Sequence, residues 1–296
     1  MGAVLKREPK LVSVVIPCYN HGEYVGEAVR SALAQAYRPL EVLVVNDGSD
    51  DPATLEALER IAANDATVLH KPNGHLSSAR NHGIRHARGE YVMTLDADDL
   101  LEPDLLARAV PILEGDSEAG VVTTHIRLFD DEGPTGTVYT PSGGGVVDFL
   151  VRNQACGGSL FRAACWDAAG GYDESMRSGS EDWEFWIAVT SAGWKVRVVP
   201  EPLYLYRRTP DSMYERTREV RAEVFRYIVE KHEELFREHL VEVLYRREVL
   251  AQETKTRARQ APEAVRASMS YRLGAALLRP ARWMRSLLWR PESRQS

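Results

Sequence analysis

The chain has 296 residues, of which 44% are hydrophobic and 27% charged, and its formal net charge is -6 at pH 7. This composition is typical of a globular protein with one large domain or one domain plus an appendage. The acidic balance excludes a protein that binds nucleic acid over most of its surface, because that function requires a basic excess. No stretch approaches the roughly 18 uninterrupted apolar residues of a membrane-spanning helix, and the N-terminus lacks an apolar segment of signal-peptide length.

The cysteine content indicates a reducing compartment. Cys18, Cys156 and Cys165 are too few and too scattered for a disulfide framework, and they lack the paired spacing of a zinc site. Reduced cysteines are usual in the cytoplasm. We therefore expect a cytoplasmic protein, and attachment to the inner face of the plasma membrane is left open.

The first two thirds of the chain alternate short β-branched runs with longer amphipathic segments. This alternation predicts an α/β fold with a mostly parallel, Rossmann-like sheet flanked by helices. The predicted strands are residues 11–17, 40–47, 66–71, 90–96 and 120–129. Helical spacing of apolar positions predicts helices over residues 24–36, 53–63, 77–87 and 103–113.

Three later segments differ in composition. Residues 130–149 are rich in Gly, Pro and Thr, which predicts a flexible loop that shapes or covers a pocket. Residues 213–254 are highly charged and helical in period, and residues 264–294 combine arginines with Leu, Met and Trp. We expect an α/β domain over residues 10–210 and a C-terminal helical extension over residues 211–296.

A cluster of three carboxylates, Asp96, Asp98 and Asp99, directly follows the predicted strand at residues 90–96. Carboxylates this close raise one another's pKa values unless a cation or strong donors lie between them. Oxygen-rich clusters suit Mg²⁺ or Mn²⁺, whose coordination shell substrate phosphates complete. The alternative is an acidic helix start in which Asp99 or Asp104 acts only as a cap.

A second acidic cluster, "NDGSDD", follows the predicted strand at residues 40–47. Gly48 suits a turn, and Asp50 or Asp51 suits a helix cap, which leaves Asp47 at the end of the strand. In open α/β sheets, ligands bind at the carboxyl ends of the strands. Asp47 is therefore placed to accept hydrogen bonds from a base imide or a ribose hydroxyl.

Six motifs in chain order resemble those of family 2 glycosyltransferases of the GT-A fold. They are "VSVVIPCYN" (residues 12–20), "EVLVVNDGSDD" (41–51), "HLSSARNHGI" (75–84), "GEYVMTLDADD" (89–99), "CGGSLFR" (156–162) and "GSEDWEFW" (179–186). The resemblance implies an inverting, divalent-cation-dependent transfer of a sugar from a nucleotide sugar. We expect a UDP-sugar donor and a glycan or lipid-linked acceptor, in the synthesis of a cell-surface polysaccharide or glycolipid.

The resemblance also implies roles for single residues. Contacts to the nucleotide sugar are expected from Pro17, Tyr19, Asn20, Asp47, Arg80, Asp96, Asp98, Gly157 and Gly158. Metal ligation is expected from Asp98 and Asp99, with Asp96 supporting the cluster. Arg207 lies where its guanidinium group is able to meet phosphate oxygens, although a solvated loop explains it as well.

The catalytic base implied by the resemblance is Asp182, with Glu181 beside it. An inverting transfer needs one carboxylate to remove the proton of the acceptor hydroxyl. The alternative interpretation is that Ser180 caps a helix whose first turn carries Glu181 and Asp182. Both interpretations are compatible, because a helix start also holds a catalytic side chain rigidly.

Departures from the family pattern sharpen these expectations. The Gln-x-x-Arg-Trp motif of processive members is absent, which favours transfer of a single sugar. Thr209 stands where relatives often carry a histidine, so a histidine contact to diphosphate or metal is in doubt. Two rival functions are a sugar-nucleotide pyrophosphorylase, although Gly22 is the only glycine in "PCYNHGEY", and a catalytically inactive member that binds glycans.

The C-terminal segments leave two kinds of partner open. Residues 264–294 form a basic amphipathic pattern that suits an anionic membrane surface, and the alternative is a helix that packs on the protein itself. Residues 213–254 suit an oligomerisation arm between two copies of the chain. We expect no nucleic-acid partner.

Overall fold

The computed structural model describes residues 6–64, 66–209 and 213–267. In this part of the chain, nine strands form one sheet in the order β3-β2-β1-β4-β8-β6-β9-β5, and β7 pairs with β6. The strands are β1 (Glu8–Cys18), β2 (Leu40–Asp47), β3 (Thr67–Lys71), β4 (Gly89–Thr94), β5 (Leu100–Leu101), β6 (Ala119–Asp130), β7 (Gly133–Tyr139), β8 (Leu160–Arg162) and β9 (Lys195–Arg207). Strands β1 to β4 run parallel, as do β6 and β9, whereas β5, β7 and β8 pair antiparallel.

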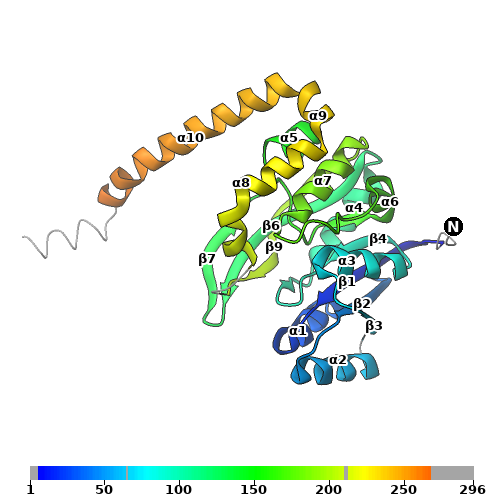
Figure 1. Cartoon of the computed structure of the whole chain (residues 1–296). Helices are drawn as coiled ribbons and strands as arrows, with labels where there is room; N and C mark the ends of the chain where they lie inside the picture. The colour runs from blue at the N-terminus through cyan, green and yellow to red at the C-terminus, as the bar shows by residue number, and fades with distance from the viewer. Residues whose placement is uncertain (1–5, 65, 210–212, 268–296) are drawn as a thin grey trace, which may run out of the picture. The chain divides into compact units, whose positions relative to one another are not determined.

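Helices lie between these strands and after the last of them along the chain (Figure 1). They are α1 (Gly22–Leu33), α2 (Pro52–Asn64), α3 (His75–His86), α4 (Leu105–Gly115), α5 (Val146–Val151), α6 (Ala163–Ala169), α7 (Glu181–Ser191), α8 (Met213–Lys231), α9 (Glu233–Glu238) and α10 (Leu240–Ala267). The predicted α/β fold with a mostly parallel sheet is confirmed. Each of the four predicted helices and five predicted strands corresponds to an element of the structure.

The alternation of side chains along β1 explains the layered packing. Val12, Val14 and Ile16 point to the face of the sheet whose core contains buried residues of α1, α2 and α4. Val15 faces α3 instead, where a Cβ on Gly83 would lie only 2.4 Å from its side chain. Both faces of β1 are therefore covered, as its nearly continuous apolar sequence predicts.

The parallel register brings the ends of neighbouring strands together. Val15 of β1 pairs with Thr94 of β4, and Cys18 pairs with Asn46 of β2. The loops after these three strands therefore lie at one edge of the sheet. Strand β5, which follows the "DADD" segment, pairs with β9 through Leu101 and Tyr204. This pairing places the end of β9 against the carboxylates.

Helix capping follows the sequence only in part. Asp51 caps α2, since its Oδ2 accepts hydrogen bonds from the N–H of Thr54 at 2.8 Å and from its hydroxyl at 2.6 Å. Asp104 precedes α4 and Ser180 precedes α7, but neither side chain makes a capping hydrogen bond. Ser180 has a φ of 62°, in the left-handed region, so the chain enters α7 through a sharp turn.

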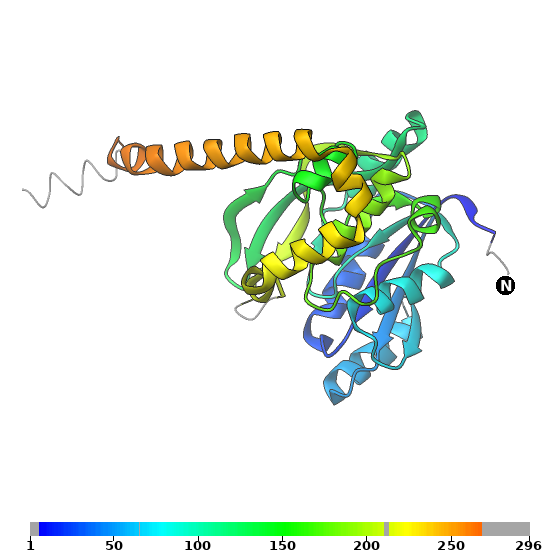
Figure 2. The same ribbon diagram turned by 45° about the horizontal axis from the view of Figure 1, so that its top comes forward.

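The prediction of a flexible loop over residues 130–149 is wrong. Strand β7 forms a hairpin with β6, and the two lie side by side in both views (Figures 1 and 2). Gly133 and Gly136 adopt φ values of 117° and 77°, so the glycines serve the turn and the strand. Helix α5 buries Phe149 and Leu150 completely. Because the segment is rich in glycine, its composition did not indicate the short apolar helix α5.

The chain divides into two compact units, residues 1–240 and residues 241–296. Helices α8 and α9 belong to the first unit. The domain boundary predicted near residue 210 stays a prediction. None of the described helices is long and apolar enough to cross a membrane. Most of the basic amphipathic pattern, residues 268–294, lies outside the described residues, so membrane attachment stays a prediction as well.

Candidate active site

The three clustered carboxylates lie on a tight turn, residues 96–99, which we call the carboxylate turn. The N–H of Asp99 donates to the carbonyl of Asp96 at 3.1 Å, which closes the turn between β4 and β5. The N–H of Leu95 donates to the carbonyl of Val15 at 3.0 Å, so the turn begins beside β1. The strand ends therefore bring the three carboxylates to the edge that the sequence predicts.

Asp99 is buried and bound by the protein. Its Oδ2 accepts a hydrogen bond from the Tyr204 hydroxyl at 2.7 Å, and its Oδ1 accepts one from the N–H of Arg207 at 2.8 Å. Burial, followed by the charges of Asp98 and Asp96, raises the pKa of Asp99 well above its usual value. Both carboxylate oxygens already join the turn to β9, and the predicted metal ligation by Asp99 stays a prediction.

Asp98 is only partly buried. Its carbonyl oxygen accepts a hydrogen bond from Nε of Arg207 at 2.9 Å. Among the described residues, its carboxylate forms no hydrogen bond with another side chain. Burial and the neighbouring charge of Asp96 raise the pKa of Asp98, whereas His21 and Arg207 lower it. Of the three carboxylates, Asp98 is therefore the one best suited to bind an added cation.

Arg80, from α3, joins the carboxylate turn to α7. Its Nη2 donates to Asp96 at 2.7 Å and its Nη1 to Glu181 at 2.6 Å, with only 2% of its side chain exposed. The guanidinium also lies 5.4 Å from the ring centre of Tyr172. Burial opposes its charge, but Asp96 and Glu181 raise the pKa of Arg80 well above its usual value. Arg80 thus holds together acids that are far apart in the sequence.

Asp182 occupies the first turn of α7 and accepts two hydrogen bonds. Nδ2 of Asn153 donates to its Oδ2 at 2.8 Å, and the N–H of Trp183 donates to its Oδ1 at 2.8 Å. Burial and the charge of Glu181 raise the pKa of Asp182 to about 6, against the opposing effects of Arg80 and the two hydrogen bonds. A carboxylate with this pKa is ionised at neutral pH yet is able to accept a proton, as a general base must.

The segment from Cys156 to Gly158 lies between the two acidic groups. Burial raises the pKa of the Cys156 thiol well above its usual value, and the charges of Asp99, Asp182 and Asp96 raise it further. These charges act on one thiol because the carboxylate turn and α7 both approach this segment. The site therefore combines the "DADD" and "SED" motifs, as the sequence predicts.

The two glycines of this segment differ in their surroundings. A Cβ on Gly157 would lie 3.6 Å from Cβ of Asp182 and 3.7 Å from Nη2 of Arg80, which are ordinary contacts. A Cβ on Gly158 would lie 2.0 Å from the ring of Tyr204, which no side chain tolerates. Gly158 thus makes room for the tyrosine that binds Asp99, a packing reason that the sequence did not reveal.

The first motif, residues 12–20, contributes an exposed aromatic ring, Tyr19, and a side chain that joins two loops, Asn20. Pro17 is buried at the end of β1, whereas Tyr19 is 45% exposed. Asn20 joins the loops after β1 and β2, because its Oδ1 accepts from the N–H groups of Asp50 and Asp51, each at 3.1 Å. Asn20 therefore positions the loop around Tyr19, and its predicted contact with the nucleotide stays a prediction.

Asp47 lies buried at the end of β2. Its Oδ1 forms an ion pair with Nζ of Lys71 at 2.5 Å and accepts a hydrogen bond from the N–H of Gly74 at 3.0 Å. Among the described residues, Oδ2 has no hydrogen-bond partner. One oxygen of Asp47 therefore remains for the base contact that the sequence predicts.

Arg207 is held by the protein rather than presented to solvent. Its guanidinium lies between the rings of Tyr24 and Phe129, 4.6 and 4.5 Å from their centres. Nη2 also donates to Glu27 at 2.6 Å. With Nε bound to the carbonyl of Asp98, Arg207 supports the carboxylate turn. Its predicted contact with phosphate stays a prediction.

A divalent cation fits this donor set only with help from a ligand. The described residues contain no group of three or more His, Cys, Asp or Glu side chains arranged to hold a metal ion. Mg²⁺ and Mn²⁺, however, are commonly bound by one or two carboxylates together with substrate phosphates. Asp98, with Asp96 nearby, matches that pattern, whereas both oxygens of Asp99 are already bound.

Several residues of the site were missed in the sequence. Asn153 lies just before the "CGGSLFR" motif, and a polar residue beside a glycine pair is a weak signal. Lys71 ends a predicted strand, whereas Tyr204 lies in β9, a strand that the sequence pattern did not predict. Neither residue type marks a functional site when it stands in a strand. Only the pairing of β2 with β3 and of β5 with β9 brings them to Asp47 and Asp99.

The fold and the site together define a GT-A glycosyltransferase. A family model described as Glycosyl transferase family 2 matches residues 13–169, more than half of the chain. The chain therefore belongs to glycosyltransferase family 2. Helix α7, which carries Asp182, lies outside the matched residues.

Known relatives support the family and differ in how much they share. The chain is 39% identical over 124 residues to an uncharacterized glycosyltransferase of Rickettsia felis, which covers 42% of the chain but 21% of that relative. It is 33% identical over 200 residues to a chondroitin synthase of Escherichia coli, with 64% and 28% covered. It is 29% identical over 212 residues to the putative glycosyltransferase EpsE of Bacillus subtilis, with 70% and 76% covered. The chain thus spans about a fifth of the Rickettsia relative and most of the Bacillus relative.

The solved structures include TarS of S. aureus, residues 1–349, in complex with UDP-GlcNAc. That structure superposes with a TM-score of 0.57 at 20% identity, over 72% of this chain and 66% of the TarS fragment. The complex of the same TarS fragment with UDP gives a TM-score of 0.56 at 21% identity. At this level of identity, the likeness shows that the fold is shared.

Proposed function

We propose that the chain transfers one sugar from a UDP-sugar to an acceptor hydroxyl, with inversion of the anomeric configuration. The observation that carries this proposal is Asp182. Its carboxylate has a pKa raised to about 6, its position is fixed by Asn153 and Trp183, and Arg80 with Glu181 connects it to the carboxylate turn. A single such base next to a diphosphate site suits direct displacement.

In the proposed reaction, Asp182 accepts the proton of the acceptor hydroxyl as the hydroxyl oxygen attacks the anomeric carbon. The bond from that carbon to the diphosphate oxygen breaks, and UDP leaves with the electron pair. One displacement inverts the configuration, because attack and departure occur on opposite faces. Glu181 already binds Arg80 at 2.6 Å, so it positions Arg80 rather than acting as a second base.

We propose that Asp98, supported by Asp96, holds a Mg²⁺ or Mn²⁺ ion when the donor is bound. Such an ion neutralises the charge of the departing diphosphate. Asp99 then supports the cation site without binding the cation, because its hydrogen bonds to Tyr204 and Arg207 fix the shape of the carboxylate turn. Arg207 fixes the same turn through the carbonyl of Asp98.

The names of similar proteins guide the choice of substrates. TarS has been solved with UDP and UDP-GlcNAc, and other similar proteins are a chondroitin synthase and a hyaluronan synthase. We therefore propose a UDP-hexose or UDP-N-acetylhexosamine donor and a polysaccharide or lipid-linked glycan acceptor. Exposed Tyr19 and the free oxygen of Asp47 suit stacking and hydrogen bonding of a uracil ring.

A donor panel tests this proposal. UDP-glucose, UDP-galactose, UDP-GlcNAc and UDP-GalNAc, and matched GDP- and TDP-sugars, would be incubated with Mn²⁺ and short glycan acceptors. We expect UDP release above the hydrolysis background with at least one UDP-sugar, and NMR of the product should show the anomeric configuration opposite to that of the donor. Retained configuration, or turnover with GDP- or TDP-sugars alone, would contradict the proposal.

A further inference from the structure

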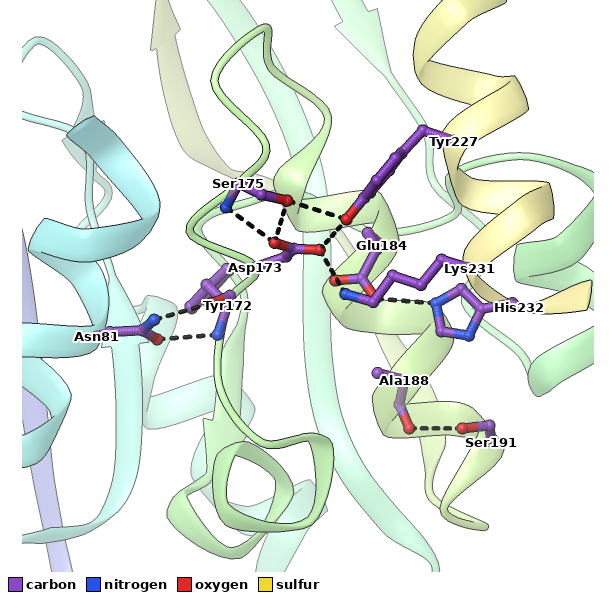
Figure 3. Close-up of polar contacts among 10 residues, drawn as sticks. All are labelled: Asn81, Tyr172, Asp173, Ser175, Glu184, Ala188, Ser191, Tyr227, Lys231 and His232. Atoms are coloured by element: carbon purple, nitrogen blue, oxygen red, sulfur yellow. Dashed lines mark hydrogen bonds and ion pairs between the residues drawn. The ribbon is translucent and has the colours of Figure 1, made fainter. Parts of the chain in front are cut away.

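Helix α8 is bound to the segment that carries Asp182 through a polar cluster that we call the clasp (Figure 3). Asp173 and Ser175 lie in the loop before α7, and Glu184 lies in α7 itself. Tyr227 and Lys231 belong to α8, and His232 follows it. The members of the clasp are therefore Asp173, Ser175, Glu184, Tyr227, Lys231 and His232. None of them belongs to the residues matched by the family model.

Lys231 makes the central contact of the clasp. Its Nζ lies 2.6 Å from Oδ2 of Asp173 and 2.9 Å from Oε1 of Glu184. Asp173 precedes Asp182 in the chain, and Glu184 follows it. One ammonium group therefore fixes both ends of the segment that presents the proposed base.

The acids of the clasp have further partners. Nε2 of His232 lies 2.8 Å from Oε1 of Glu184, whose side chain is 2% exposed. The hydroxyl groups of Tyr227 and Ser175 donate to Asp173 at 2.7 and 2.6 Å. Burial opposes ionisation, but the hydrogen bonds from Lys231, Ser175 and Tyr227 lower the pKa of Asp173. Asp173 is thus held in its ionised form by hydrogen bonds from within the clasp.

An aromatic contact reinforces the same connection. The ring of Trp183 in α7 stacks on Phe225 of α8, with ring centres 5.6 Å apart and an interplanar angle of 17°. The indole N–H of Trp183 donates to the carbonyl of Phe149 at 2.7 Å. Because the backbone N–H of Trp183 also binds Asp182, any shift of this residue would move the base.

We propose that Lys231 is a positioning residue for the transfer reaction, and that α8 is thereby part of the catalytic apparatus. This inference rests on the proposed function of Asp182. Lys231 contacts no reacting atom, but it holds the loop and the helix turn on either side of the base. Loss of this ammonium group leaves the two acids without their shared cation, which loosens the first turn of α7. Misplacement of a reacting group by about 1 Å is enough to slow catalysis severely.

The test compares Lys231→Met with two other variants. Lys231→Arg keeps the charge, and Arg226→Met removes an exposed cation of the same helix. Each protein would be assayed for kcat at saturating donor, for UDP affinity by calorimetry with Mn²⁺, and for amide hydrogen exchange in α7. All measurements would be made well below the melting temperature of each variant, so that partial unfolding is excluded.

We expect Lys231→Met to lower kcat about tenfold, with UDP affinity changed less than about twofold. Exchange of the amides in the first turn of α7 should become faster. Lys231→Arg should restore most of kcat, and Arg226→Met should resemble the unmodified chain. Unchanged α7 exchange would overturn the inference, as would an unchanged kcat or equal losses of kcat and UDP affinity.

The outcomes separate this inference from the proposed function. If Asp182→Asn retains full activity, the base assignment fails, whatever Lys231→Met does. If Asp182→Asn is inactive but Lys231→Met is normal in kcat and exchange, only the role of Lys231 fails. Because the exchange experiment needs no substrate, it tests the positioning role even for a chain whose donor has not been found.

Discussion

The candidate active site and the clasp are two clusters of buried and partly buried acids that lie within a few residues of one another on α7, yet their charges are compensated differently. In the clasp, Lys231 and His232 contact Glu184, and Lys231 also contacts Asp173. The site has more acids than the clasp but no more basic residues. It contains Asp96, Asp98, Asp99, Glu181 and Asp182, and its cations are Arg80, which binds two of these acids, and Arg207.

The pKa shifts run in opposite directions in the two clusters. Hydrogen bonds from the clasp lower the pKa of Asp173, whereas burial and neighbouring carboxylates raise the pKa values of Asp98, Asp99 and Asp182. A cluster that supplies its own cations is a structural connection. A cluster with uncompensated negative charge is prepared to receive a cation or a proton, and strongly perturbed carboxylates of this kind are typical of functional sites.

The largest effect expected from this comparison concerns Asp182. Asp182→Asn should lower kcat by about a thousandfold, because the amide cannot accept the proton of the acceptor. UDP affinity measured by calorimetry with Mn²⁺ should stay nearly unchanged. The control is Asp167→Asn, at an exposed position of α6, which should keep full activity. Substantial transfer by Asp182→Asn would show that another group is the base.

Glu184→Gln removes charge from the compensated cluster. We expect the free energy of unfolding to fall by about 3 kcal/mol, since the variant leaves the partners of a buried carboxylate without their counter-charge. Urea denaturation followed by circular dichroism measures this loss. The matched control is Glu230→Gln, at an exposed position of α8, which should change stability by less than about 0.5 kcal/mol. Equal stability of both variants would show that the clasp contributes little.

Asp98→Asn removes charge from the uncompensated cluster, and the expected change has the opposite sign. When the pKa of a group is higher in the folded than in the unfolded chain, the protein loses stability as pH rises through the interval between the two pKa values. The ionised form of Asp98 is therefore unfavourable for the folded state at pH 7. Without a divalent cation, Asp98→Asn should therefore melt at a higher temperature than the unmodified chain.

With Mn²⁺ and UDP, the ranking should reverse, because the variant is expected to bind the cation and nucleotide at least about tenfold more weakly. Differential scanning calorimetry with and without these ligands measures both effects. Asp104→Asn, an exposed change outside the site, serves as the control. An unchanged Mn²⁺ response in Asp98→Asn would contradict the proposed cation site.

The smallest effect concerns the pH dependence of transfer. Because Asp182 acts as a base only when ionised, kcat/KM should rise as pH increases through about 6 and level off above it. The hydrogen bond from Asn153 stabilises the carboxylate, so Asn153→Ala should move this midpoint to higher pH by about half a unit. Initial rates between pH 5 and 8 test the shift. An unmoved midpoint, or one moved to lower pH, would contradict the role of Asn153.

Much of the fold followed from local patterns. The β-branched runs that end at Asp47 and Asp96 gave the strands, and their parallel order placed both acids at one edge of the sheet. The structure of residues 130–149 was predicted wrongly because glycines and prolines dominate their composition, although α5 begins within them and buries Phe149 and Leu150. A few apolar residues without periodicity do not predict a helix or strand. Their role becomes clear only when the core against which they pack is known.

The sequence named many of the residues that the structure brings together at the candidate site, but it did not indicate how they contact one another. Arg80 and Glu181 were both recognised by resemblance, yet no local pattern indicated that they form an ion pair. Arg207 was expected at phosphate, and the structure places it between Tyr24 and Phe129 with a hydrogen bond to the Asp98 carbonyl. Such contacts join distant segments, so the type and spacing of residues cannot reveal them.

The sequence by itself determined the family, the strands near the N-terminus and the acidic clusters that follow two of them, because these depend on local periodicity and ordered motifs. Only the tertiary structure decided which of those acids already have partners. Asp99 is bound by Tyr204 through the pairing of β5 with β9, and Glu184 is bound by Lys231 through the packing of α8 on α7. The charge of a carboxylate is set by what surrounds it in space, and that environment exists only in the folded chain.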